Sequence, residues 1–485
     1  MGVIFNQSFK STISYYIGMI IGAVNTVILY PLIFNDNPKY LGLIQILLAY
    51  SIVLSIFSNL SLPAIIIRYF PVVNKKGQLF FFSLILSIIG FTSFCVLYIY
   101  FIKDLIIDDQ EIGLILDYSN YIIPLVFFIS FSDVLSALSR SYLDSSTPIF
   151  LNEVFLKVYS IIVLSCYGLN YIQFDTFIKI YFAGYFIRFF LLLGIQLYFK
   201  RLFFEFDYSE LQIKKMLKFG FFVILGGTTA LLISKIDMLM IGSYIDLENV
   251  AYYSVAFYIG NAIMVPGRSI TAISTPLVAE AWKNNDLKLI RKIYYKSSIN
   301  QIIVGGLFFL CIWINIDNIM FILPDKFSGG KYIVLFIGLS RLISLGVGVN
   351  SSIIINSKYY KFDLISNIPF LLFIIVSNHL LIPAFGINGA AFATLISTFL
   401  FYVIRIIFVI VKFQMQPFNL NTLKTISLLF AIFLVIENIS LDYNVYFDVI
   451  LRLVIALILF VPLMYKMKMS IDINNIILKF IKKIL

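Results

Sequence analysis

The segment Leu380–Ser397, LLIPAFGINGAAFATLIS, interrupts two long apolar runs with a proline, two glycines and an asparagine. Gly386 and Gly389 allow backbone angles that bulky residues resist, and Pro383 is expected to end the preceding helix. The residues that follow are small: Ala390, Ala391, Ala393 and Thr394. Small side chains let one membrane helix approach another closely. We therefore predict a tight turn between two closely packed helices.

The composition places the whole chain in a membrane. Of its 485 residues, 61% are hydrophobic and only 13% are charged, whereas soluble proteins carry about a quarter charged residues. Lipid offers no partners to backbone groups, so each apolar run must be a helix. We predict an all-α polytopic protein with about fourteen transmembrane helices. The expected spans are residues 12–35, 40–62, 79–102, 117–138, 149–169, 175–199, 217–242, 249–274, 297–323, 331–356, 362–384, 388–412, 423–440 and 446–466.

The charges of the loops predict the orientation. Alternate loops are basic and include Lys75, Lys76, Lys200, Arg201, Lys283, Lys292, Lys358, Lys361 and Lys412. The loops between them hold DLIIDDQE at 104–111, Asp246, Glu248 and Asp442. The positive-inside rule then places both termini in the cytoplasm of a multi-pass inner-membrane protein. The net charge of +11 faces anionic lipid and requires no nucleic acid partner.

An internal repeat divides the chain. Gly168–Asn170 and Gly386–Asn388 share a Gly-x-Asn pattern 218 residues apart (386 − 168). Arg188 in YFIRFFLLL and Arg405 in YVIRIIFVI lie 217 residues apart (405 − 188). Spans 1–6 therefore pair with spans 7–12 as two lobes related by a parallel repeat, with substrate expected between them. The predicted parts are an N-terminal lobe at 1–200, a C-terminal lobe at 201–415, and spans 13–14 with an amphipathic cytoplasmic tail at 416–485.

Charges inside the spans are costly and usually functional. The acids there are few, namely Asp133, Glu153 and Asp237, whereas the bases are Arg188, Lys235, Arg268, Arg341 and Arg405. Such a basic interior suits an anionic substrate better than a cationic drug. We predict that the substrate is bound by Arg268, Arg68, Arg188, Arg341 and Arg405. The alternative is that Arg68 and Arg268 extend to the lipid headgroups.

No residues indicate an enzyme or a resident cofactor. Cys95, Cys166 and Cys311 all lie in apolar runs without metal-ligand spacing. A membrane glycosyltransferase or polymerase would need acids, bases or a metal in a folded region outside the membrane. The loops are too short for such a region, so we expect no enzymatic activity.

Three segments resemble the polysaccharide flippases of the multidrug/oligosaccharidyl-lipid/polysaccharide exporter superfamily. LLIPAFGINGAAFATLIS resembles the family's span 11–12 signature. KIDMLMIGSYIDLENVAYYSVA at 235–256 is similar to its span 7–8 segment, and RYFPVVNKKG at 68–77 resembles its end of span 2. The resemblance implies a flippase that moves a polyprenyl-pyrophosphate-linked oligosaccharide from the cytoplasmic to the periplasmic leaflet by alternating access. Such a protein serves the biosynthesis of O-antigen and lipopolysaccharide, capsule or exopolysaccharide.

The resemblance also implies secondary sites. The last two helices of a fourteen-span member form a groove for the lipid tail, and other polysaccharide assembly proteins are expected partners. Asp237, Asn378 and Thr394 match a cation-coupling set, which implies a sodium or proton gradient as the driving force. Alternatively, Asp237 pairs with a neighbouring base. The competing function is a cation-coupled multidrug exporter of the same superfamily.

The charge pattern makes a direct prediction about topology. Reporter domains fused after Asp109 and after Lys292 should report opposite sides of the membrane, because the two loops differ in basic charge. Activity of a phosphatase reporter, which folds only in the periplasm, and of a cytoplasmic fluorescent reporter measures this. The same side for both fusions would overturn the predicted orientation.

Overall fold

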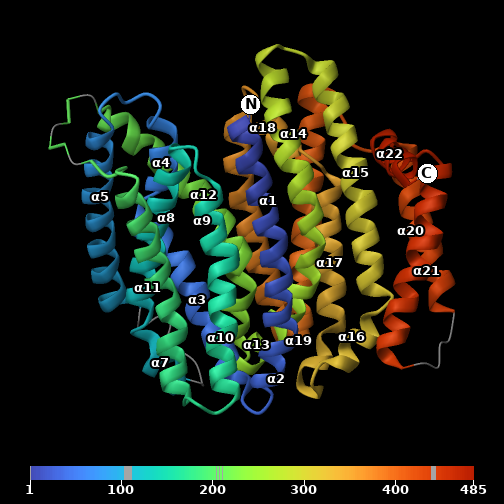
Figure 1. Cartoon of the computed structure of the whole chain (residues 1–485), viewed down its shortest axis with the longest axis horizontal. Helices are drawn as coiled ribbons and strands as arrows, with labels where there is room; N and C mark the ends of the chain where they lie inside the picture. The colour runs from blue at the N-terminus through green and yellow to red at the C-terminus, as the bar shows by residue number, and fades with distance from the viewer. Residues whose placement is uncertain are drawn as a thin grey trace. The chain divides into compact units, whose positions relative to one another are not determined.

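The computed structural model describes residues 2–102, 112–203, 205–206, 208–209, 211–438 and 444–484. All regular structure in these ranges is helical (Figure 1), which confirms the predicted fold class. The predicted acidic loop 104–111, which includes Asp109, lies outside the described residues, as do Lys103 and Asp442. Among the described residues, twelve helices are long and apolar enough to cross a membrane.

The chain forms two compact units, Met1–Ser254 and Val255–Leu485. Their boundary falls inside α13, Leu247–Asn261, which contributes residues to both units. The predicted lobes 1–200 and 201–415 and the C-terminal part 416–485 rest on the sequence repeat and stay predictions.

The first unit follows the predicted spans 1–7. Spans 1, 3 and 5 each combine α-helix with a stretch of π-helix, the wider form that often marks functional sites. The elements are α1 Gly2–Ala23, η1 Val24–Leu29, α2 Tyr30–Ile33, α3 Pro38–Asn59, α4 Leu62–Tyr69, α5 Lys76–Leu97, η2 Tyr98–Ile102, α7 Ile112–Ser119, α8 Ile122–Ser141, α9 Ser146–Phe150, η3 Leu151–Phe155, α10 Leu156–Gly168, α11 Phe174–Tyr198 and α12 Ile213–Tyr244.

The second unit contains the remaining helices. α14 and α15 pack together, α17 packs on α19, and α20 stands beside α15 and α21 (Figure 1). The elements after α13 are η4 Ala262–Met264, α14 Val265–Lys283, α15 Leu287–Trp313, α16 Ile316–Ile322, η5 Asp325–Gly330, α17 Lys331–Gly346, α18 Asn350–Ile355, α19 Tyr360–Phe413, α20 Leu420–Glu437, α21 Val445–Lys466 and α22 Ile471–Ile484.

The 54-residue helix α19 is a hairpin of two antiparallel arms. Ring pairs join its ends: Phe362 stacks on Phe408 with centroids 3.7 Å apart, and Phe370 on Phe401 at 4.4 Å. Nearer the turn, the Ser377 and Ser397 hydroxyls lie 3.2 Å apart. The paired residue numbers sum to nearly the same value, which only an antiparallel register produces. The turn is Gly386, with φ 58° and ψ −142°.

The hairpin explains one of the two spans by which twelve differs from fourteen. Its two arms are the predicted spans 362–384 and 388–412, counted once as a single helix. The predicted span 217–242 corresponds to α12, which has 32 residues but is not among the twelve. In α12 the side chains of residues 225–228 and 230 lie outside the described set.

The two glycines of the turn have different roles. Gly386 adopts a backbone conformation that L side chains rarely adopt, although a Cβ there would have open space around it. At Gly389 a Cβ would overlap the carbonyl oxygen of Leu381 on the opposite arm, so this glycine supplies space and not a special angle. The expectation that Pro383 ends the helix is wrong, because it lies inside the first arm, which continues to the turn.

The second arm of α19 packs through small buried residues. Ala390, Ala391 and Ala393 are fully buried, and α17 packs against α19. This confirms the prediction that the alanines allow close helix packing.

The predicted start of span 9 at residue 297 is wrong by ten residues. α15 begins at Leu287, because the Asp286 side chain accepts from the Leu289 N–H at 2.9 Å and caps the helix. Lys292, expected in a loop, therefore lies on a helix. Near the C-terminus, Lys296 of α15 pairs with Asp472 of α22 at 2.6 Å, which docks the amphipathic tail.

The two turn glycines allow a test that separates backbone strain from lack of space. Gly386→Ala should lower stability by about 1–3 kcal/mol through its backbone conformation alone. Gly389→Ala should lower stability through the overlap with Leu381. Gly194→Ala is the control, since a Cβ there meets nothing within 4 Å and alanine favours a helix. Thermal unfolding of the purified variants in detergent measures this, and equal midpoints for all three would contradict the account of the turn.

Candidate functional site

The first unit contains a break in a buried helix. α3 ends at Asn59 and α4 begins at Leu62, and the two residues between them have positive φ, 48° at Leu60 and 56° at Ser61. Non-glycine residues in this conformation cost about 1–3 kcal/mol each and persist where the surroundings enforce them. The Asn59 side-chain oxygen accepts from the Ser61 N–H at 3.0 Å. Strain of this kind is common at functional sites.

A polar pocket of about 420 Å³ lies beside this break. Its wall comes from α3, α4, α8, η3, α11 and α12, all within the first unit. Its polar lining residues are Ser55, Asn59, Ser61, Asp133, Asn152, Tyr185 and Arg188. Asp133 and Arg188 are the two charged residues of this lining, so its formal charge sums to zero.

Arg188 has spare donor capacity. The residue is 6% exposed, and its Nη2 lies 3.6 Å from Asp133 Oδ1. Its Nε is buried and has no hydrogen-bond partner among the described residues. Asp133 is more open, with 39% of its side chain exposed. A buried donor without a partner is costly, and Arg188 has fewer protein partners than its donors could use.

A second ion pair lies next to the pocket and was missed by the sequence analysis. Lys157 Nζ lies 3.0 Å from Glu153 Oε2 and donates to the Gly18 carbonyl at 3.0 Å. Asn152, which lines the pocket, donates to Glu153 at 3.2 Å. The available signal was a lysine four residues after a glutamate within one apolar span, a spacing that places both on one helix face.

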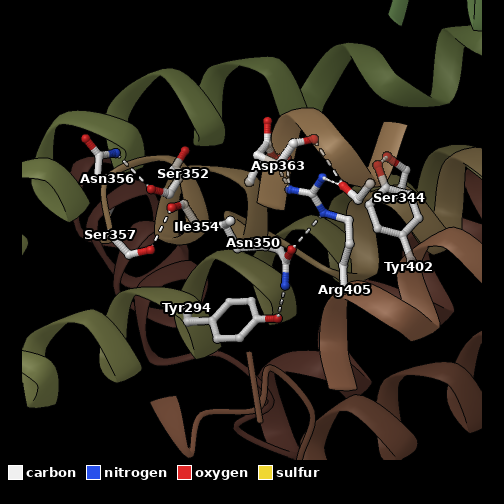
Figure 2. A network of polar contacts seen from close by, with 12 residues as sticks. Tyr294, Ser344, Asn350, Ser352, Ile354, Asn356, Ser357, Asp363, Tyr402 and Arg405 are labelled. Carbon is white, nitrogen blue, oxygen red and sulfur yellow. Dashed lines mark hydrogen bonds and ion pairs between the residues drawn. The ribbon is translucent and has the colours of Figure 1, made fainter. Parts of the chain in front are cut away.

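Arg405, the repeat partner of Arg188, is buried in the second unit within a network of protein partners (Figure 2). The residue is 1% exposed. Its Nε donates to Asn350 Oδ1 at 3.1 Å, and it forms an ion pair with Asp363 on the opposite arm of α19. Two further hydrogen bonds reach Ser351 at 2.8 Å and Ser366 at 3.3 Å. Asn350 in turn donates to the Tyr294 hydroxyl at 2.9 Å.

The two arginine sites match in the sequence repeat. Asp133 and Asn350, the partners of Arg188 and Arg405, lie 217 residues apart (350 − 133), the same offset as the arginines. Tyr185 and Tyr402 share this offset as well (402 − 185). The remaining partners of Arg405 are not repeated: the residues 217 positions before Ser351, Asp363 and Ser366 are Val134, Ser146 and Ile149. The first unit therefore keeps the central pair and lacks the additional partners.

None of the other predicted substrate residues lines the polar pocket. Arg68 is exposed at the end of α4, with its guanidinium 4.2 Å from the Phe219 ring centroid. Arg268 is exposed in the first turn of α14. Arg341 is partly buried on α17, 5.4 Å from the Phe257 ring centroid. That these residues bind substrate stays a prediction.

The three residues predicted to bind a coupling cation lie in both units. Asp237 is 5% exposed and accepts from the Tyr253 hydroxyl at 2.7 Å within the first unit. Asn378 and Thr394 are buried on α19, and the hairpin register places them at one level of its two arms. Their joint role in coupling stays a prediction, which the ion dependence of transport by Asp237→Asn would decide.

The second unit also holds a large apolar cavity of about 1070 Å³. Its wall combines α15, α17, the second arm of α19 and α20, with Phe418 between α19 and α20. None of its lining residues is charged. The polar atoms of its side chains belong to Trp313 and Tyr402, so it suits a long apolar group.

Comparisons with known proteins identify the fold. A MatE family model matches residues 223–380. The structure of the lipid II flippase MurJ in an inward closed conformation aligns with a TM-score of 0.70 and 14% identity, covering 96% of this chain and 99% of that chain. The chain has the MATE and MurJ fold.

Two further solved structures align over less of the chain. An inward-facing multidrug resistance MATE transporter of the MOP superfamily has a TM-score of 0.63 and 15% identity, covering 83% of this chain and 94% of that chain. A MOP superfamily transporter from Pyrococcus furiosus, described as having a binding pocket of reverse polarity, has a TM-score of 0.59 and 15% identity, covering 84% of this chain and 95% of that chain. No curated protein sequence matches the chain at a significant level.

The Arg405 network predicts a large structural effect. Arg405→Lys should lower stability by about 3–5 kcal/mol, because lysine cannot reproduce the guanidinium donors and leaves buried partners unsatisfied. Lys331→Gln, which removes the exposed pair with Asp317, is the control and should change stability by about 0–1 kcal/mol. Thermal unfolding in detergent compares them. If Arg405→Lys unfolds at the wild-type midpoint, the Arg405 network does not stabilise the fold.

Proposed function

We propose that this protein is a flippase that moves a polyprenyl-pyrophosphate-linked oligosaccharide from the cytoplasmic to the periplasmic leaflet by alternating access. The observation that carries the proposal is the apolar cavity of about 1070 Å³ with no charged lining residue. A polyprenyl chain is long, uncharged and apolar, so such a cavity holds it without leaving polar groups unsatisfied.

The C-terminal helices support this assignment of the cavity. α20, the predicted span 13, contributes Ile426, Leu429, Phe430 and Phe433 to its wall. A Cβ at Gly306 would overlap the Leu429 side chain, so this glycine on α15 lets α20 approach closely. α20, which lies beyond the repeat, therefore helps build the apolar cavity, as a tail-binding groove requires.

The polar pocket of the first unit supports an amphiphilic substrate. It is polar, whereas the cavity of the second unit is apolar, as the head and the tail of an amphiphile are. The exposed Arg268 and Arg68 remain candidates for the pyrophosphate, because a guanidinium binds phosphate oxygens through forked hydrogen bonds. We infer an inner-membrane location and a role in surface polysaccharide synthesis from the same substrate class.

A multidrug exporter is the second candidate, and the similarity to an inward-facing multidrug resistance MATE transporter favours it. An organic cation needs a buried acid that is available to it. The described acids at these sites already have partners: Asp133 pairs with Arg188, Asp363 with Arg405, and Asp237 accepts from Tyr253. This distribution of charges favours the flippase.

The cavity can be tested with two adjacent residues of α19. Val403 lines the cavity, whereas Ile404 is 54% exposed and does not line it. Val403→Trp should fill part of the cavity and reduce translocation at least tenfold, while Ile404→Trp should leave it near the wild-type rate. The measurement is translocation of a fluorescent polyprenyl-pyrophosphate-linked oligosaccharide in proteoliposomes.

The outcomes of this assay separate the two candidates. If wild-type protein moves no lipid-linked oligosaccharide but exports ethidium against a cation gradient, the flippase proposal fails. If Val403→Trp and Ile404→Trp translocate equally well at equal abundance, the cavity does not bind the tail.

The pyrophosphate site is tested at Arg268. Arg268→Lys keeps the charge and loses the forked donors, so it should reduce translocation at least tenfold if Arg268 binds the pyrophosphate. Lys283→Arg on the same helix serves as a control, with abundance checked by immunoblotting. Wild-type translocation by Arg268→Lys would exclude forked recognition at this residue.

A further inference from the structure

The polar pocket beside Arg188 has a chemistry different from that expected of a pyrophosphate site. We propose that it binds a neutral sugar ring of the oligosaccharide through a pair of neighbouring hydroxyl groups. This inference rests on the proposed function and assigns the sugar end of that substrate to the first unit.

The charge of the pocket is the first argument. Its lining contains one aspartate and one arginine that already pair with each other at 3.6 Å. A pyrophosphate carries acceptors only, so it would meet the Asp133 carboxylate, another group without donors. Like charges at close range repel. The formal charge of zero therefore fits an uncharged ligand.

The geometry of the pair is the second argument. A carboxylate only accepts hydrogen bonds and a guanidinium only donates them. A sugar hydroxyl does both. Two adjacent hydroxyls can donate to Asp133, whose side chain is 39% exposed, and accept from the guanidinium of Arg188, which lines the pocket.

The rest of the lining is the third argument. Asn59 and Asn152 supply amides, and Ser55, Ser61 and Tyr185 supply hydroxyls, all of which pair with hydroxyl groups in either direction. The pocket volume of about 420 Å³ lies within the range of small-ligand sites. The helix break at Leu60–Ser61 places Asn59 and Ser61 in this wall, which gives the strained backbone a role.

The repeat supplies the fourth argument. Arg405 has an asparagine where Arg188 has Asp133, and its remaining donors bind Ser351, Asp363 and Ser366. Those additional partners are absent at the matching positions of the first unit. The second unit therefore fills its arginine site with protein groups, whereas the first unit keeps a pocket there. We infer that the ligand's hydroxyls take the place of these protein groups.

The test uses the full-length protein in detergent, with saturation-transfer NMR for free sugars and 31P NMR line broadening for inorganic pyrophosphate. Glucose, galactose and N-acetylglucosamine are the neutral probes, and glucuronic acid and pyrophosphate are the anionic ones. We expect transfer to at least one neutral sugar and no broadening of the pyrophosphate signal at equal concentration. Asn152 is exposed at the pocket. Asn152→Leu should weaken sugar binding at least tenfold without disturbing the ion pair between Asp133 and Arg188.

Asp133→Asn gives a second, opposite readout. It should weaken neutral sugar binding at least tenfold and create pyrophosphate binding, because Arg188 loses its counter-charge. The asparagine beside Arg405 at the matching position indicates that this pair is compatible with folding. Phe186→Leu, an exposed position on α11, is the control and should bind like wild type.

Three results would overturn the inference. The first is pyrophosphate binding to the wild type that is not increased by Asp133→Asn. The second is the lack of transfer to any neutral sugar. The third is sugar binding that is unchanged by both Asn152→Leu and Asp133→Asn. The translocation assay separates this failure from that of the proposed function. Translocation without sugar binding rejects only the sugar site, and sugar binding without translocation rejects the flippase.

Discussion

A charge inside a lipid bilayer needs partners from the protein, because the hydrocarbon supplies none. Arg405 meets this requirement with contacts from two elements. Asn350 reaches it from the start of α18 and Asp363 from the opposite arm of α19, and Asn350 in turn donates to Tyr294 of α15. The second unit depends on this arrangement, since the network joins the hairpin to α15 and α18. The Gly386 turn and the Phe362–Phe408 stack hold the same antiparallel register.

The repeat shows how one arrangement serves two purposes. Arg188 and Arg405 keep the same spacing to their partners Asp133 and Asn350. In the second unit, hydroxyls and a carboxylate complete the coordination of the guanidinium, so the site stabilises the fold. In the first unit the corresponding residues include Val134 and Ile149, which offer no hydrogen bonds. What remains there is a polar pocket whose arginine has a donor to spare, and this difference is the basis of the proposed sugar site.

The proposal of a lipid-linked glycan as the substrate rests on the contrast between two pockets. One pocket is apolar and large, and the other is polar with paired charges. A transporter of organic cations requires an available acid, whereas Asp133, Asp237 and Asp363 each contact a protein partner. The MATE and MurJ fold accommodates both functions, so the decision rests on these side chains and not on the architecture.

The sequence by itself determined the helical fold class, most span positions and the turn in LLIPAFGINGAAFATLIS. Continuous apolar runs of about 20 residues satisfy their backbone in lipid as helices, and glycine is the residue that a turn at φ 58° favours. It also identified Arg188 and Arg405 as related residues. Only the tertiary structure decided that Gly389 provides space for Leu381, that α15 starts at its Asp286 cap, and that Arg405 is enclosed while Arg188 keeps an unpartnered Nε among the described residues. These properties depend on residues distant in sequence that meet only after packing, which no local pattern records.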